Sequence, residues 1–294
     1  MFELADRLQL GIAAIVVVLV IGTLVAIPLL QGGLPDDTPD PLNLQVALYM
    51  GEGAWADEET ILTHMFEWMG CNLTTVRGDD IRDGCLDNYG ILVWPGGHYP
   101  AYWDEVGLDG KARIQEFVDG GGGYFGICAG AYYACDYVVW MDDDAFPPPD
   151  YKVDGLELNL DLYPGVAWGP IFEIVDRPEP GFAMEQVDIV NHSHPITDNM
   201  PDHLSMMYAG GPYLQPHDGA NVTILGVYNT TGTPAIVACH YGNGRVFLAG
   251  PHGEIEECSD RDGWQFAVPY DEPEDEDSEW PLYYEAVKWL AQIP

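Results

Sequence analysis

The stretch Gly120-Gly-Gly-Gly-Tyr-Phe-Gly-Ile-Cys-Ala-Gly-Ala-Tyr-Tyr-Ala134 decides the fold of this chain. Its apolar residues 124–127 predict a short buried strand that runs into Cys128, and small residues follow at once. The pattern Gly126-Ile-Cys128-Ala-Gly130 is the cysteine counterpart of G-x-S-x-G, a strained strand-to-helix turn that presents a nucleophile. Amides at the start of the following helix favour a thiolate and a developing oxyanion. Taken alone, the motif fits a buried cysteine in a glycine-rich turn equally well.

Strands and helices alternate around this turn. We predict strands at residues 44–50, 72–76, 91–94 and 124–127, with helices after Asp57 and Asp109. This order predicts an α/β fold with a doubly wound, mostly parallel sheet of the flavodoxin-like kind. Residues 153–190 predict an antiparallel insertion, and later strands are expected at 222–227, 234–239 and 245–248. Ligands bind such sheets at the carboxyl ends of strands, so residues 95–97 and Cys128 are expected to share a site.

The N-terminus carries a predicted membrane anchor. Residues 10–30 form an apolar run without charge, and about 21 residues suffice for a helix to cross a bilayer. We therefore expect a cytoplasmic N-terminus at residues 1–9, a transmembrane helix at 10–30, a linker at 31–42 and one domain at 43–294. Arg7 precedes the span and Asp36 follows it, which predicts a single-pass protein of the cell membrane with its N-terminus inside and its body outside.

The charge balance limits the class of partner. The 294 residues include 48 acidic and 10 basic side chains, a formal net charge of -38. This excess of negative charge argues against a nucleic-acid partner. Hydrophobic residues make up 47% of the chain, so it is able to form a substantial core. The acidic surface fits high-salt solubility, cation binding or assembly at a cell exterior.

An exterior location implies two kinds of covalent modification. Four N-x-[ST] sequons are candidate glycosylation sites, at Asn72, Asn191, Asn221 and Asn229. The chain has six cysteines, which pair in oxidising compartments. If Cys128 is a nucleophile, five remain, and we expect bridges between Cys71 and Cys85 and between Cys239 and Cys258. Connectivity does not follow from sequence alone.

A thiolate nucleophile needs a base, and the base needs an orienting group. His252 and Glu254 stand two residues apart just after a predicted strand, so their side chains are expected on one side of the chain. The amides of Gly97 and Ala129 are the expected oxyanion donors. His98 is expected to line the same site. The histidines of the loop-rich region are interpreted as structural: His192, His194, His203 and His217.

These residues resemble the class I glutamine amidotransferase-like superfamily and, within it, the branch similar to the N-terminal domain of biotin-protein ligase. The matching stretches are Val46-Ala-Leu-Tyr-Met-Gly51, Val93-Trp-Pro-Gly-Gly97, Gly123-Tyr-Phe-Gly-Ile-Cys-Ala-Gly-Ala-Tyr-Tyr133, His194-Pro-Ile-Thr197, Tyr208-Ala-Gly-Gly-Pro-Tyr213 and Tyr241-Gly-Asn-Gly-Arg-Val246. The resemblance implies Cys128 as nucleophile, His252 as base and Glu254 as its orienter. The family usually has His-Pro-Glu where this chain has His-Gly-Glu, and glycine loosens that turn.

Two functions of different classes follow from these residues. The first is a membrane-anchored extracellular cysteine amidohydrolase that acts on a small amide or peptide substrate. The second is a non-catalytic surface protein on the same scaffold, with self-assembly or a surface partner as its role. A glutaminase subunit that feeds a membrane partner is a third reading. We expect no cofactor. We also predict no metal centre, because the acidic runs 142–144 and 271–277 lack the spacing of a calcium loop, and a loose calcium site on these runs stays an open alternative.

Overall fold

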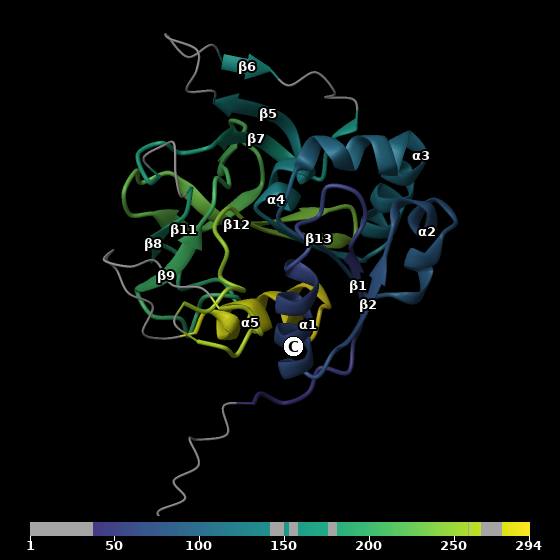
Figure 1. The fold of residues 1–294 in the computed structure, drawn as a ribbon, viewed down its shortest axis with the longest axis horizontal. Helices are drawn as coiled ribbons and strands as arrows, with labels where there is room; N and C mark the ends of the chain where they lie inside the picture. The colour runs from purple at the N-terminus through teal and green to yellow at the C-terminus, as the bar shows by residue number, and fades with distance from the viewer. Residues whose placement is uncertain (1–37, 142–149, 153–157, 176–180, 258, 266–277) are drawn as a thin grey trace, which may run out of the picture. The chain divides into compact units, whose positions relative to one another are not determined.

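The computed structural model of the chain describes residues 38–141, 150–152, 158–175, 181–257, 259–265 and 278–294. Residues 38–294 form one compact unit (Figure 1). Its main sheet has nine strands in the described part of the chain, in the order β2-β1-β3-β4-β13-β12-β11-β8-β9. The first five are β2 (Asn72–Val76), β1 (Gln45–Tyr49), β3 (Ile91–Trp94), β4 (Gly123–Ile127) and β13 (Gly244–Ala249). These five are all parallel, which confirms the predicted parallel core.

The other half of the sheet differs from the prediction. It consists of β12 (Pro234–Tyr241), β11 (Val222–Tyr228), β8 (Ala183–Ile189) and β9 (His203–Tyr208), and every pairing from β13 outward is antiparallel. Four of the eight pairings are therefore parallel, and the prediction of a mostly parallel sheet was wrong. The reason is local: short hairpin connections such as the one at residues 242–243 reverse the chain, whereas parallel neighbours need a crossover.

A second sheet packs against one face of the first. Its described strands are β5 (Cys135–Met141), β6 (Asp150–Lys152), β7 (Tyr163–Gly169) and β10 (Tyr213–Pro216), in the order β10-β7-β5-β6. Strand β5 begins directly after the short helix α4 (Ala129–Ala134), so the helix that follows the cysteine has only six residues. The four-stranded sheet therefore starts one short helix after Cys128.

Alternating residues of the main sheet point to two separate cores. Val46, Phe125 and Phe247 belong to the core under α1 (Glu58–Trp68) and α5 (Trp280–Leu290). Ala47 and Tyr124 belong to the opposite core. That core is covered by α2 (Gly78–Arg82), the 3-10 helix η1 (Cys85–Asn88), α3 (Tyr99–Asp119), α4 and the second sheet. Because both faces are buried, the central strands are apolar at nearly every position.

These two cores overturn the predicted bridge between Cys71 and Cys85. Cys71 is buried in the core under α1 and α5, whereas Cys85 packs against the opposite core. The sheet separates the two sulfurs, and both are free thiols. Cys239 is also a free thiol, buried in the same core that Cys85 contacts. Its predicted partner, Cys258, lies outside the described residues.

The predicted span at residues 10–30 also lies outside the described residues, as do residues 1–9 and the first part of the linker. In the ranges that the structure describes, no helix has both the length and the apolar character needed to cross a membrane. Three of the sequon asparagines are exposed, namely Asn72, Asn221 and Asn229, and Asn191 is half-buried. The acidic runs 142–144 and 271–277 fall outside the described residues.

Candidate active site

Cys128 occupies the turn between β4 and α4 and has a strained backbone. Its φ of 48° and ψ of -106° lie outside the regions that side chains normally allow. The two motif glycines make this turn feasible: a Cβ on Gly130 would lie 2.2 Å from the carbonyl oxygen of Trp94, and one on Gly126 would lie 2.8 Å from that of Gly130. The Cys128 amide donates to the Ala249 carbonyl at 2.9 Å. This bond joins the carboxyl ends of β4 and β13.

The predicted oxyanion donors lie beside the sulfur. Gly97 and Ala129 line a cavity together with Cys128. Gly97 has a φ of 143°, and a Cβ there would lie 2.1 Å from the carbonyl oxygen of Gly53, so only glycine fits. The His98 amide donates to the same Gly53 carbonyl at 2.8 Å and fixes the turn. The amides of Gly97 and Ala129 donate no hydrogen bond to any described residue, which leaves both available to a ligand.

His252 follows the end of β13 and lies beside Cys128. Its imidazole is 1% exposed and lines a cavity together with Cys128. Its Nδ1 lies 2.5 Å from Oε1 of Glu254, which is fully buried. Because Nδ1 faces the carboxylate, the other ring nitrogen, Nε2, is the atom left for the sulfur. The structure therefore places the three residues of the predicted triad side by side.

The charges of this group raise two pKa values. Burial alone would lower the pKa of His252, but the charges of Glu254 and Cys128 and hydrogen bonds to both raise it well above its usual value. Burial and the neighbouring charge of Glu58 raise the pKa of Glu254 to about 7, although His252 acts in the opposite direction. A positive imidazole is thus stabilised between a carboxylate and a sulfur, which is the arrangement that activates a thiolate.

Hydrogen bonds from distant parts of the chain hold the turn that carries this pair. The amide of Gly253 donates to the Tyr283 hydroxyl at 3.0 Å, a bond that the family's usual proline is unable to make. The His252 amide donates to the Met207 carbonyl at 2.8 Å. The indole of Trp280 donates to the Glu254 carbonyl at 3.0 Å. Glycine at this position therefore does not leave the turn loose.

A second buried carboxylate, Glu58, was not found by sequence reasoning. It is the first residue of α1, and its side chain is fully buried. Its Oε1 lies 3.4 Å from Nδ1 of His252 and accepts a hydrogen bond from the Gly96 amide at 3.3 Å. In the sequence it resembles any acidic residue of a first helical turn, where such residues favour the helix dipole. Only its burial, which needs the fold, separates it from its exposed neighbour Glu59.

The cluster of Glu58, His252 and Glu254 is compact enough to suggest a metal site, since its ligand atoms lie within 4.8 Å of one another. However, the 2.5 Å between Nδ1 of His252 and Oε1 of Glu254 is hydrogen-bond contact. Two ligands on one zinc ion, each at about 2.1 Å, lie about 3 Å apart. The geometry therefore fits a shared proton better than a metal ion.

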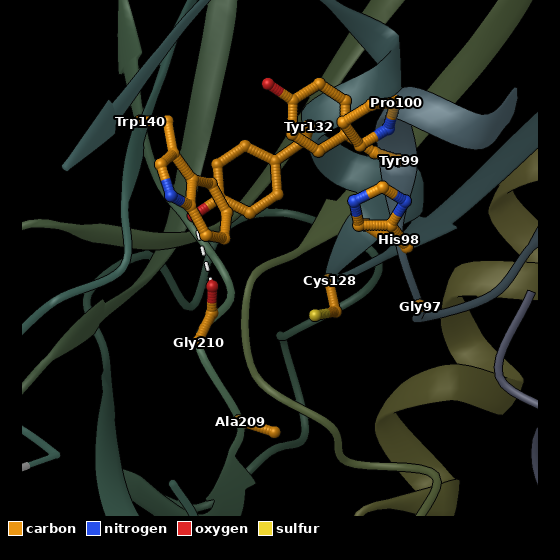
Figure 2. Close-up of a pocket in the computed structure, with 10 residues that line it drawn as sticks. Gly97, His98, Tyr99, Pro100, Cys128, Tyr132, Trp140, Ala209 and Gly210 are labelled. Carbon is orange, nitrogen blue, oxygen red and sulfur yellow. Dashed lines mark hydrogen bonds between the residues drawn. The ribbon is translucent and has the colours of Figure 1, made fainter. Parts of the chain in front are cut away.

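Cys128 opens onto two cavities. The larger has a volume of about 330 Å³, and Figure 2 shows the sulfur between the Tyr132 and Trp140 rings on one side and His98 and Gly97 on the other. The smaller has a volume of about 230 Å³ and is also lined by His252. His98 lines the larger cavity, as expected. The other sequence-predicted sites lie elsewhere: none of the sequon asparagines, nor Cys71, Cys85 or Cys239, lines either cavity.

The fold is that of class I glutamine amidotransferase-like proteins of known structure. A solved structure of PurLQS from Thermotoga maritima matches with a TM-score of 0.53 at 16% identity, covering 85% of this chain and 100% of that one. A ThuA-like protein from Bacteroides uniformis matches with a TM-score of 0.50 at 15% identity, covering 88% of this chain and 95% of that one. At such identities these likenesses concern the fold.

Within that class, the chain belongs to the family described as biotin-protein ligase, N terminal, whose model matches residues 72–272. It is 32% identical to the biotin-protein ligase of Schizosaccharomyces pombe over 172 residues, which are 56% of this chain and 25% of that protein. It is 30% identical to an uncharacterized protein of Chlamydia muridarum over 174 residues, 58% of this chain and 62% of that protein. The chain thus spans about a quarter of the ligase and under two thirds of the second relative.

Proposed function

We propose that this protein is a cysteine amidohydrolase, anchored in the cell membrane by residues 10–30 with its body outside, that hydrolyses an amide or peptide bond. One observation carries the proposal: the buried imidazole of His252 is hydrogen-bonded to Glu254 and lines a cavity together with the Cys128 side chain. The strained backbone of Cys128 adds support, because such strain persists where the surrounding structure holds it and is common at reactive residues.

In the proposed reaction, the thiol proton of Cys128 moves to Nε2 of His252, and the sulfur attacks the amide carbon. The carbonyl oxygen becomes an oxyanion that accepts hydrogen bonds from the amides of Gly97 and Ala129. The carbon–nitrogen bond then breaks, and Nε2 returns its proton to the departing amine. Water, deprotonated by the same nitrogen, attacks the thioester, which releases the carboxylic acid and regenerates the thiol. Glu254 keeps Nδ1 of His252 protonated throughout.

Glu58 is proposed as a positioning residue for the same imidazole. Its Oε1 approaches Nδ1 of His252 from α1 and also accepts from the Gly96 amide, next to the proposed oxyanion donor Gly97. One carboxylate therefore connects the base with the turn that stabilises the oxyanion. We expect its loss to affect both the orientation of His252 and the position of the Gly97 amide.

The proposal is tested by trapping the acyl-enzyme. The full chain is mixed with 4-nitrophenyl acetate, an activated ester that acylates nucleophilic cysteines, and the released nitrophenol and the modified peptide are measured. We expect a burst of one nitrophenol per chain and an acetyl group on Cys128. His252→Gln should abolish the burst, and Trp168→Ala, a change in β7 away from both cavities, should leave it intact. A correctly folded chain that gives no burst would contradict the proposal and favour a non-catalytic surface protein.

The location has its own test. Protease added to intact cells should cut an exposed body that faces outward, and glycans on Asn72, Asn221 or Asn229 would mark the same side in a host that glycosylates sequons. A body that is protected in intact cells and cut only after lysis would contradict the external location. It would leave the proposed chemistry of Cys128 standing.

A further inference from the structure

The two cavities at Cys128 differ in what lines them. The larger is lined by the aromatic residues Tyr99, Tyr132 and Trp140, along with Ala129. The smaller contains His252, which does not line the larger. Cys128 lines both, so a substrate attacked by the sulfur has one part on each side. Each side therefore has a different chemical task.

The position of the acid and of the oxyanion donor orients the substrate. The departing amine must receive its proton from Nε2 of His252, so it has to lie in the smaller cavity. Of the two proposed oxyanion donors, Gly97 lines both cavities, whereas Ala129 lines only the larger one. The acyl part of the substrate is therefore placed in the larger cavity, against the aromatic side chains.

These aromatic side chains form a continuous group. The rings of Tyr99 and Tyr132 stack with centroids 5.3 Å apart and an angle of 18°. The Trp140 ring follows at 5.6 Å from that of Tyr132. The Tyr132 hydroxyl already donates to the Gly210 carbonyl at 3.1 Å (Figure 2), so this residue offers mainly its ring to a ligand. Faces and edges of this kind bind flat apolar groups.

Among the described residues, the lining of the larger cavity includes no Asp, Glu, Lys or Arg. The titratable groups of this described lining are His98, the Tyr hydroxyls and the Cys128 thiol. Among the described basic side chains, Lys111 pairs with Asp161 and Arg245 contacts Trp289, both away from the cavity. A substrate carboxylate or ammonium group would enter without a partner, which is costly. The volume of about 330 Å³ is near the lower end of ligand pockets, about 300–1,000 Å³, so the acyl group is small.

We propose that the larger cavity is the acyl subsite and that it takes an uncharged acyl group with a flat ring, whereas the amine leaves through the His252 cavity. This inference rests on the proposed function. The substrate class is thus an amide of a small aromatic acid. Amino acid amides with charged α-amino and α-carboxylate groups, such as glutamine, fall outside it.

The reactive test uses aldehydes, whose carbon forms a reversible bond with a cysteine sulfur while the aldehyde oxygen takes the thiol proton. Three probes are compared for protection of Cys128 against iodoacetamide: 3-phenylpropanal, butanal and succinic semialdehyde, which carries a carboxylate. Burial of a phenyl ring should let 3-phenylpropanal protect at a concentration roughly tenfold to a hundredfold lower than butanal. Succinic semialdehyde should protect less well than butanal. Equal protection by all three, or better protection by the carboxylate, would overturn the inference.

A second test does not depend on the thiol. The non-reactive amide 3-phenylpropanamide is titrated into the Cys128→Ser protein, with butanamide and succinamate as controls. Trp140→Ala should weaken binding of the phenyl amide roughly tenfold. Trp168→Ala, which removes an equally half-buried indole of the same four-stranded sheet, should not. If the Cys128→Ser protein preferred the phenyl amide but Cys128 of the unmodified protein were unreactive, only the proposed function would be contradicted. If Cys128 were reactive but neither test showed a preference for the ring, only this inference would be contradicted.

Discussion

The two turns that meet at the site are held in opposite ways. The turn of Cys128 depends mainly on its own neighbours, because Gly126 and Gly130 remove the side chains that would block it, and one backbone bond to Ala249 joins it to β13. The turn of His252 and Glu254 is held by residues far away in the sequence, among them Tyr283 and Trp280 from α5. The first turn is therefore a local property of a short motif. The second exists only once the whole domain has folded.

The largest loss of stability is expected from a substitution that disrupts the Cys128 turn. In Gly130→Ala the new Cβ would lie 2.2 Å from the backbone oxygen of Trp94, which is unable to move without disturbing β3. We expect the free energy of unfolding to fall by about 3 kcal/mol, the upper range for an added methyl group in a packed site. Urea denaturation of both proteins measures it. A loss below about 1 kcal/mol would show that the turn relaxes easily.

The matched change in the second turn is Gly253→Ala. A Cβ there would lie 3.1 Å from the Cβ of Glu279 and from the Tyr283 hydroxyl, and 3.2 Å from the terminal methyl of Met206, so these neighbours need to shift only slightly. We expect a loss of about 1 kcal/mol or less by the same denaturation measurement. If this variant were as unstable as Gly130→Ala, the difference between the two turns would disappear.

A charge next to the second turn gives a pH-dependent effect. The pKa of Glu254 is raised to about 7 by burial and by Glu58, so the folded chain keeps a proton on it that the unfolded chain loses near pH 4.5. The folded state then binds more protons, and stability falls as pH rises between these values, by up to about 1.4 kcal/mol per pH unit. Glu58→Gln removes one charge, lowers the pKa of Glu254 and should flatten this fall. Denaturation at several pH values between 4.5 and 7 measures the slope.

The control for that change is Glu59→Gln, which removes an exposed charge from the same helical turn. Its slope should match that of the unmodified protein. The raised pKa of His252 affects stability only above pH 6.5, in the unmodified protein and in both variants. There, stability is lost as the pH rises through the pKa of His252 in the folded state. Identical slopes for Glu58→Gln and the unmodified protein would show that Glu58 does not influence Glu254.

A loss of stability is also expected from Tyr283→Phe, which leaves the buried Gly253 amide without its acceptor. The loss should be about 1–2 kcal/mol, the usual effect of a buried donor that loses its partner. The same variant should also slow alkylation of Cys128, because the turn that positions His252 loosens. Alkylation that is unchanged would mean that Met207 and Trp280 hold this turn without Tyr283.

The smallest effect concerns cysteines outside both turns. Cys85 is a half-buried free thiol, so Cys85→Ser should change the free energy of unfolding by no more than about 0.5 kcal/mol. In denaturant without reductant, Cys71 and Cys85 should each react with maleimide. If neither cysteine reacted until a reductant was added, Cys71 and Cys85 would be joined by a disulfide, which would contradict the structure.

The sequence allowed prediction of what is local. The Cys128 turn, the strands beside it and the spacing of His252 and Glu254 all depend on residues within a few positions, and residues 91–94 form β3 as predicted. Glu58 was missed because burial of a first-turn carboxylate depends on distant packing. The separation of Cys71 from Cys85 was missed for the same reason, because it depends on which face of the sheet each cysteine reaches, and spacing does not encode that.

The most direct measurement of the central claim is the rate of Cys128 alkylation by iodoacetamide from pH 5 to 9, with Cys85 as an internal reference thiol. If His252 activates the sulfur, Cys128 should react rapidly at pH 6.5, and His252→Gln should slow its alkylation about a hundredfold there, toward the rate of an ordinary thiol. Cys85 should not change. Equal rates for Cys128 with and without His252 across the whole pH range would contradict the account.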